Sequence, residues 1–144
     1  MKMLKFILFL LISCTMILVI SCDKPNQNQT IPNVAVDLYL DINSTIYVQL
    51  STVGGWVYLT GGYKGILVYR ISADEFVAYD RTCPYDPYVA NSRLEMDLSN
   101  LTVTDTVCKS QFVILDGSII SGPATVPMKR YNATFDGNIL RIYN

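Results

Sequence analysis

Apolar and polar residues alternate with a period of two along much of this 144-residue chain, and no other feature constrains the fold as strongly. Successive side chains of a β-strand point to opposite faces of a sheet, so an alternating segment buries one face and exposes the other. The pattern predicts strands within residues 34–40, 46–50, 93–98 and 101–104. No segment beyond the first 21 residues keeps a helical period.

A second set of segments is apolar at nearly every position and rich in residues that favour strands, such as Val, Ile, Tyr and Phe. These segments are residues 56–59, 66–71, 76–79 and 112–115. Because an uninterrupted apolar run has no side suited to water, we interpret them as strands covered by other layers on both faces.

Two Asp-Gly dipeptides indicate hairpins in the second half of the chain. Asp-Gly readily adopts the positive φ angles of a tight turn, so it predicts pairing between the flanking segments. The turns at 116–117 and 136–137 predict pairing of 112–115 with 118–120 and of 131–135 with 139–143. Short strands separated by turn residues predict an all-β domain, either an antiparallel sandwich or a small barrel.

The first 21 residues predict a secretory signal. Lys2 and Lys5 precede an apolar run over residues 6–20, and Ser21-Cys22 follows it. A basic start, an apolar stretch and a small residue before the cleavage site are typical of such a signal, and the Cys after it resembles a bacterial lipobox. By that resemblance Cys22 becomes the lipidated first residue. The alternative is an uncleaved anchor, but the run is shorter than the ~20 apolar residues of a spanning helix.

The chain is thereby divided into a lipoprotein signal peptide at 1–21, a polar tether at 22–33 and a β domain at 34–144. A bacterial lipoprotein modification would add several acyl chains to Cys22, and several chains anchor a protein stably. We therefore expect attachment to the bacterial cell envelope through the N-terminal lipid, with the outer membrane favoured. Without Lys2 and Lys5 the protein keeps nine basic and twelve acidic residues. No basic patch stands out, so we expect no nucleic-acid partner.

The four cysteines have different fates under this prediction. Cys14 leaves with the signal and Cys22 is acylated, which leaves Cys83 and Cys108 as a pair. An exported protein meets an oxidising environment in which disulfides persist. The chain has no histidine, so a Ser–His–Asp triad is impossible and we expect a protein that is not an enzyme.

A series of motifs occupies the second half of the chain: Arg81-Thr82-Cys83-Pro84-Tyr85-Asp86-Pro87, Cys108-Lys109-Ser110-Gln111-Phe112, Asp116-Gly117, Gly122-Pro123-Ala124, Pro127 and Tyr131. Their order resembles the cluster-binding half of a Rieske iron–sulfur domain, over about Gly61 to Asn144. The resemblance implies a Rieske-like antiparallel β-sandwich or small barrel with ligand-loop hairpins. A Rieske 2Fe–2S centre is held by two Cys and two His, and this chain contains no His.

The resemblance assigns four degenerate cluster positions. Cys83 corresponds to the Cys of the first ligand loop, and Tyr85 stands where that loop has its His. In the register that preserves the Ser-x-Phe match downstream, Asp105 stands at the second-loop Cys and Cys108 at the second-loop His. Asp86 lies in a loop, where a single carboxylate is usually solvated.

A second register places Cys108 at the Cys and Gln111 at the His, and neither register restores a His. Gly122 and Pro123 correspond to the loop that covers the cluster in the family. Because the two ligand loops meet around the cluster, the resemblance implies that Cys83 and Cys108 lie within bonding range. We therefore expect a Cys83–Cys108 disulfide in place of a metal, and no cofactor; the alternative is a 2Fe–2S cluster with unusual ligands.

Three classes of function remain. We favour a non-enzymatic envelope lipoprotein whose Rieske-like domain is a structural or partner-binding module. The resemblance implies that an envelope protein partner would contact the tip formed by residues 83–89, 108–111 and 122–127, because this tip meets redox partners in the family. The second class is electron transfer through a 2Fe–2S cluster with non-standard ligands, and the third is a glycan-binding sandwich. The sequence contains no specific carbohydrate motif.

Overall fold

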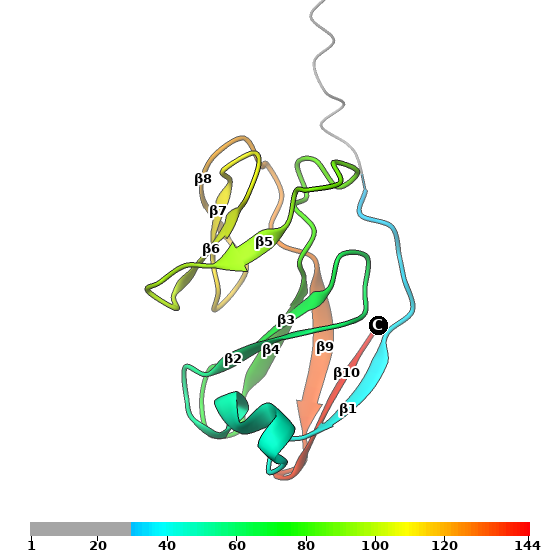
Figure 1. The fold of residues 1–144 in the computed structure, drawn as a ribbon, viewed down its shortest axis with the longest axis vertical. Helices are drawn as coiled ribbons and strands as arrows, with labels where there is room; N and C mark the ends of the chain where they lie inside the picture. The colour runs from blue at the N-terminus through cyan, green and yellow to red at the C-terminus, as the bar shows by residue number, and fades with distance from the viewer. Residues whose placement is uncertain (1–29) are drawn as a thin grey trace, which may run out of the picture.

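The structure is a computed structural model that describes residues 30–144 (Figure 1). The predicted signal peptide, Cys22 and the first part of the predicted tether lie outside the described residues. Within the described part no helix has the length and apolar character needed to cross a membrane. The predicted all-β class is confirmed, because two antiparallel sheets account for the regular structure of residues 30–144 apart from one short 3₁₀ helix.

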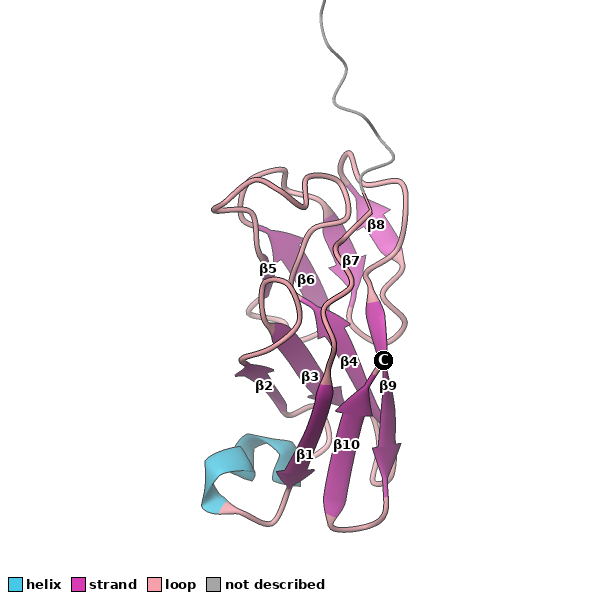
Figure 2. Cartoon of the chain, turned by 90° about the vertical axis from the view of Figure 1, so that its right-hand side faces the viewer, coloured by secondary structure: helices cyan, strands magenta, loops and turns pink. Residues whose placement is uncertain are grey.

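Six antiparallel strands form the larger sheet in the order β1-β10-β9-β4-β3-β2. Their bounds are Asp37–Asp41 (β1), Trp56–Leu59 (β2), Ile66–Arg70 (β3), Phe76–Asp80 (β4), Arg130–Phe135 (β9) and Ile139–Tyr143 (β10). The smaller sheet has the order β5-β6-β7-β8. Its strands are Leu94–Met96 (β5), Thr102–Asp105 (β6), Gln111–Val113 (β7) and Ile119–Ser121 (β8), and it lies at one end of the larger sheet (Figure 2).

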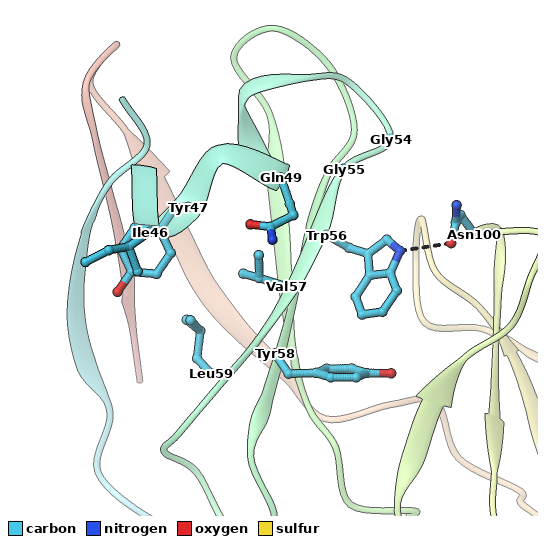
Figure 3. A pocket seen from close by; sticks show the side chains of 10 residues that line it. All are labelled: Ile46, Tyr47, Gln49, Gly54, Gly55, Trp56, Val57, Tyr58, Leu59 and Asn100. Atoms are coloured by element: carbon cyan, nitrogen blue, oxygen red, sulfur yellow. Dashed lines mark hydrogen bonds between the residues drawn. The ribbon is translucent and has the colours of Figure 1, made fainter. Parts of the chain in front are cut away.

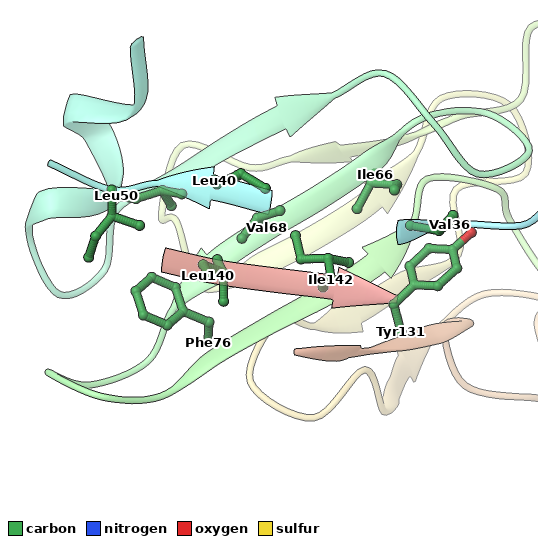
Figure 4. Close-up of a cluster of buried hydrophobic side chains, with 11 residues drawn as sticks. Val36, Leu40, Leu50, Ile66, Val68, Phe76, Tyr131, Leu140 and Ile142 are labelled. Atoms are coloured by element: carbon green, nitrogen blue, oxygen red, sulfur yellow. The ribbon is translucent and has the colours of Figure 1, made fainter. Parts of the chain in front are cut away.

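The larger sheet curls around a cluster of buried apolar side chains, which we call the first core (Figure 4). Val36 and Leu40 come from the β1 region, and Leu140 and Ile142 come from β10. The Leu38 side chain would lie only 3.7 Å from a Cβ placed at Gly61, in the β2–β3 turn. Strand β1 at one edge therefore approaches the β2–β3 hairpin at the other, and the sheet is partly closed.

Strands β3 and β4 separate the first core from a second one. Their residues alternate between the two, so Ile66 and Val68 contribute to the first core while Leu67 and Tyr69 contribute to the second. The smaller sheet covers the second core with side chains that include Leu94, Val103 and Phe112. The prediction that 66–71 and 76–79 are covered on both faces is correct, whereas β2 and β7 are only partly buried.

The predicted strand at 46–50 is wrong, because residues Thr45–Ser51 form a 3₁₀ helix, η1. Ser44 caps its start by accepting a hydrogen bond from the backbone N–H of Ile46. The apolar alternation buries only Leu50, while Ile46 and Val48 are 72% and 58% exposed. No neighbouring strand pairs with this segment, so its local cap decides its conformation.

Both Asp-Gly hairpins are confirmed. Strand β7 pairs with β8 across the turn at Gly117, and β9 pairs with β10 across the turn at Gly137. The two glycines have positive φ angles of 77° and 101°. The β4–β5 and β6–β7 connections, which carry the two cysteines, both lie at the smaller-sheet end of the molecule (Figure 1).

Candidate functional site

The two cysteine loops meet. Cys83 follows β4 and is fully buried, Cys108 lies between β6 and β7, and their sulfur atoms are 3.3 Å apart. The structure holds both as free thiols, so it brings the predicted partners together without the predicted bond, which has an S–S length of about 2.05 Å. The juxtaposition joins residues 25 positions apart in the sequence.

The carboxylate of Asp105, which is fully buried, organises the Cys108 loop. One of its oxygens accepts hydrogen bonds from the backbone N–H groups of Val107 and Cys108, each at 2.8 Å. Lys109 then adopts a positive φ of 62°, which is uncommon outside glycine. These contacts reverse the chain within a few residues and bring the Cys108 thiol close to Cys83.

Asp86 joins this group, contrary to the prediction that it is a solvated loop carboxylate. It is only partly exposed. The hydroxyl of the buried Ser92 lies 2.7 Å from an Asp86 oxygen and 2.8 Å from the second oxygen of Asp105. Single ligand atoms of Cys83, Asp86, Asp105 and Cys108 all lie within 4.8 Å of one another. Two sulfurs and two carboxylate oxygens therefore form one compact group, the S2O2 group.

The S2O2 group contains Cys83, Asp105 and Cys108 of the four predicted degenerate positions, but not the fourth. Tyr85 is instead partly buried against the second core. Gln111, the His position of the alternative register, donates to Asp97 at 3.2 Å. Asp86 and Ser92 are the two members of the site that the sequence did not indicate.

The Cys83 thiol is buried and the Cys108 thiol is partly buried, and neither has a lowered pKa. Burial raises the pKa of both Cys83 and Cys108. The Cys108 thiol lies 3.1 Å from the Ser110 hydroxyl and can donate to it. Reactive cysteines typically have lowered pKa values, and burial acts in the opposite direction at both thiols.

Lys64 is the cationic side chain beside the site. Its ammonium group donates to the backbone carbonyls of Val89 and Ser92 at 2.6 and 2.9 Å. Burial lowers the pKa of Lys64, and the nearby charges of Asp86, Asp105 and Cys83 oppose this. Lys64 therefore supports the β4–β5 loop and adds positive potential, but it makes no ion pair with either carboxylate.

A second buried carboxylate, Asp80, supports the start of the Cys83 loop. It accepts hydrogen bonds from the Tyr63 N–H and the Tyr131 hydroxyl, both at 2.7 Å, and from the N–H and hydroxyl of Thr82. Gly62 has a φ of 61°, and a Cβ there would lie 2.6 Å from the Asp80 carboxylate. The Asp80 network thus ties the β2–β3 turn, β4 and β9 together below the site.

The predicted cover loop packs against the Cys108 loop. Gly122 has a φ of 97°, and a Cβ there would lie 2.5 Å from the Cα of Ser110. The hydroxyl of Ser110 accepts a hydrogen bond from the N–H of Ala124 at 3.0 Å. Glycine is therefore needed at 122 for the close contact between the two loops.

No protein-family model matches the chain, and no curated protein matches it in sequence. Solved structures that resemble the chain at low sequence identity include the following three. The ferredoxin of carbazole 1,9a-dioxygenase from Nocardioides aromaticivorans IC177 has 13% identity and a TM-score of 0.47, covering 76% of this chain and 97% of the ferredoxin.

The second, described as the small subunit of an NADH-dependent nitrite reductase from Mycobacterium tuberculosis, has 14% identity and a TM-score of 0.45, covering 78% of this chain and 97% of its own. The third is a chain from a complex of reduced oxygenase and oxidized ferredoxin in carbazole 1,9a-dioxygenase. It has 17% identity and a TM-score of 0.46, covering 73% of this chain and 92% of its own.

The S2O2 group does not fit a Rieske 2Fe–2S centre. Such a centre needs two His ligands, and the chain has none. In a two-metal centre, a ligand atom on one metal is separated from a ligand atom on the other by two metal–ligand bonds and the metal–metal distance. A metal–thiolate bond is about 2.3 Å long, so such ligand atoms lie farther apart than those around a single metal. Ligand atoms that all lie within 4.8 Å of one another are as compact as the ligands of a single metal.

A groove of about 690 Å³ between η1 and β2 is a second candidate site (Figure 3). Trp56 and Tyr58 line it. However, the Trp56 indole donates to Asn100 at 2.9 Å, and the Tyr58 hydroxyl accepts from the Met96 N–H at 2.8 Å. Both aromatic side chains thus use their polar atoms to join the two sheets, which does not favour a glycan site.

Proposed function

We propose that this protein is an envelope lipoprotein whose Rieske-like domain lacks an iron–sulfur cluster and acts as a non-catalytic, partner-binding module. In the mature protein a Cys83–Cys108 disulfide joins the two loops that hold the cluster in Rieske domains. The supporting observation is the 3.3 Å contact between the two sulfurs, which lie in separate loops. The lipobox-like Cys22 supports attachment to a membrane.

The disulfide requires an oxidant. The oxidant is the disulfide of an exported thiol oxidase. The two thiols give it two protons and two electrons, so the Cys83–Cys108 bond forms while the disulfide of the oxidase is reduced to a dithiol. Exported compartments keep protein disulfides oxidised. Cys83 is buried, so the bond is expected to be structural rather than catalytic.

The partner is expected to bind the loops at the cysteine end. Apolar side chains are exposed there, including Tyr88 at 58%, Val107 at 46% and Val126 at 49%. Exposed apolar groups gathered in adjoining loops are typical of protein interaction sites. The Tyr88 hydroxyl also donates to the backbone carbonyl of Thr30, so the chain enters the domain at this same end.

Protein purified from its native envelope without reductant provides the deciding test. We expect a peptide that joins Cys83 to Cys108, no stoichiometric iron or inorganic sulfide, and no absorption from an iron–sulfur cluster. Stoichiometric iron with a reduced-state EPR signal would instead establish the electron-transfer alternative. Recovery of both cysteines as free thiols would remove the disulfide from the proposal.

Partner binding is tested with two matched tyrosine variants. Tyr88→Ala changes the cysteine end, whereas Tyr39→Ala removes a 62% exposed tyrosine from β1, outside the cysteine loops. In envelope cross-linking we expect Tyr88→Ala alone to lose a discrete adduct while its thermal unfolding stays unchanged. Equal adducts in both variants would contradict a partner face at these loops.

A further inference from the structure

We propose that the reduced protein binds a single thiophilic divalent cation, of which Zn²⁺ is the type, through Cys83, Asp86, Asp105 and Cys108. These are the residues of the S2O2 group, whose ligand atoms lie within 4.8 Å of one another. They come from the β4–β5 loop, the end of β6 and the β6–β7 loop. The cation would join the loops in the dithiol form, as the disulfide does in the oxidised form.

The charges of the group are unbalanced without a cation. The Ser92 hydroxyl has one hydrogen, yet it lies 2.7 and 2.8 Å from oxygens of Asp86 and Asp105. Only one of these contacts can be a hydrogen bond donated by the hydroxyl to a carboxylate. Across residues 30–144 the ion pairs are Arg81 with Glu95 and Arg141 with Asp37, so neither site carboxylate forms an ion pair, and Lys64 beside the site supplies one positive charge for two carboxylates. A buried carboxylate that lacks an ion-pair partner is costly.

The dimensions of the group match a tetrahedral metal. Zinc binds thiolate sulfur at about 2.3 Å and carboxylate oxygen at about 2.0–2.2 Å, so ligand atoms around one zinc lie roughly 3.3–3.8 Å apart. The two sulfurs are 3.3 Å apart, and the remaining separations do not exceed 4.8 Å. Shifts of the side-chain ligand atoms by about one ångström or less would therefore bring all four atoms to metal-binding distances.

The mixture of ligand atoms selects the class of metal. Mg²⁺ and Ca²⁺ require shells made of oxygen, and half of this group is sulfur. Thiolate pairs favour Zn²⁺ and similar soft or borderline ions. Asp105 is already held by the N–H groups of Val107 and Cys108. Such supporting hydrogen bonds orient a ligand and strengthen a metal site.

Metal binding and disulfide formation exclude each other, because both use the two sulfurs. Binding of M²⁺ releases the two thiol protons and forms two metal–thiolate bonds without electron transfer. Oxidation by a disulfide-class oxidant removes two electrons from the same sulfurs and forms the S–S bond. The oxidised protein is therefore expected to bind no cation at this site.

The test uses the full-length protein in detergent, reduced with a non-thiol phosphine and freed of metal. Calorimetric titration with Zn²⁺ should give one site per chain, and Co²⁺ should give the visible and charge-transfer absorption of tetrahedral thiolate coordination. The same protein oxidised with diamide should give neither signal. A folded, fully reduced protein that binds no Zn²⁺, or binds it equally well when oxidised, would overturn the proposal.

Variants locate the site. Cys108→Ser should weaken Zn²⁺ binding at least about 100-fold and abolish the charge-transfer band, and Asp86→Asn should weaken binding about 10-fold or more. Asp116→Asn is the matched control, because Asp116 is an exposed loop aspartate outside the group. Far-UV circular dichroism of each variant confirms that it is folded. If Asp86→Asn and Asp116→Asn bind Zn²⁺ alike, Asp86 is not a ligand and the four-residue site is refuted.

The outcome does not depend on the proposed function. Peptide mapping of native protein reports which form exists in the envelope, whereas Zn²⁺ titration reports what the reduced form binds. An oxidised native protein that binds Zn²⁺ only after reduction would support both proposals. An oxidised native protein whose reduced form binds no Zn²⁺ would support the first and refute the second.

Discussion

Strands β3 and β4 separate two cores that differ in the polar groups they contain or adjoin. The first core consists of apolar side chains with one tyrosine, Tyr131, whose hydroxyl donates to the Asp80 carboxylate. The second core contains Cys83 and adjoins the buried polar groups Asp105, Ser92 and Ser110. The larger sheet therefore encloses its core with strands of four to six residues, and the smaller sheet places more buried polar groups beside its core.

The larger sheet therefore contributes mainly to stability, and the loops of the smaller sheet carry the chemically unusual groups. An apolar core tolerates little change, whereas a small sheet with strands of three or four residues can carry unusual groups in its loops. We expect the smaller sheet to open at a lower free energy than the larger sheet, because local opening begins where burial is least extensive.

The largest expected effect concerns the two cores. Phe112→Ala in the second core and Leu140→Ala in the first should each lower the free energy of unfolding, by about 3–5 and 2–5 kcal/mol. Both side chains are fully buried. Hydrogen exchange should show that Phe112→Ala exposes amides of β6 and β7 while β10 stays protected. Loss of protection throughout the protein in both variants would show that the two regions unfold as one unit.

Next in size is the cross-link. Chain-entropy arguments give a disulfide that closes this loop a stabilisation of about 3–4 kcal/mol. We expect denaturant unfolding of oxidised and reduced wild-type protein, each free of metal, to differ by about this amount. The double variant Cys83→Ser/Cys108→Ser should show no dependence on reductant. A wild-type protein indifferent to reductant would indicate that the bond does not form.

Two buried tyrosines, Tyr131 in the first core and Tyr79 in the second, should differ in how replacement by Phe changes the free energy of unfolding. Tyr131→Phe removes a hydrogen bond to the Asp80 carboxylate and should destabilise the protein by about 1.5–3 kcal/mol. The Tyr79 hydroxyl is buried without a hydrogen-bond partner among residues 30–144, and burial raises the pKa of Tyr79 to about 12. Tyr79→Phe should therefore be neutral or stabilising by up to about 1 kcal/mol. Urea unfolding measures both, and destabilisation by Tyr79→Phe would show a partner for its hydroxyl.

The most gradual effect is the pH dependence of the reduced protein. Burial raises the pKa of the Cys83 thiol above its unfolded value, so the folded protein keeps a proton that the unfolded chain releases above about pH 8.5. This contribution is fully present below that pH and is lost as the pH rises toward the folded pKa. The free energy of unfolding should fall by up to about 1.4 kcal/mol per pH unit for this thiol. Urea unfolding across this range should show no such thiol-linked fall for the oxidised protein, which serves as the control.

The sequence predicted the strands well, since alternation and turn residues are local signals. It failed at Thr45–Ser51, where alternation of Ile46, Val48 and Leu50 suits a strand, but Ser44 caps a 3₁₀ helix and no strand among residues 30–144 pairs with the segment. A period-two pattern cannot reveal whether a partner strand is present, and this explains the error.

The site was predictable only in part. The resemblance brought Cys83 and Cys108 together, but Asp86 and Ser92 were missed because the contacts of the Ser92 hydroxyl with Asp86 and Asp105 depend on loops that converge in space. Asp80 gave one usable signal, since it is a charged residue that ends the apolar run of β4. A carboxylate at such a position is buried only when several donors converge on it, and sequence patterns do not report those donors.

Thr30, the first described residue, lies beside Tyr88 at the cysteine end. If Cys22 carries the lipid, the chain between them reaches roughly 30 Å at full extension. The loops then stay close above the bilayer, and the search for a partner becomes largely two-dimensional. A flexible insert between Cys22 and Thr30 should allow the loops to bind partners that lie farther from the lipid surface, without altering the loops themselves.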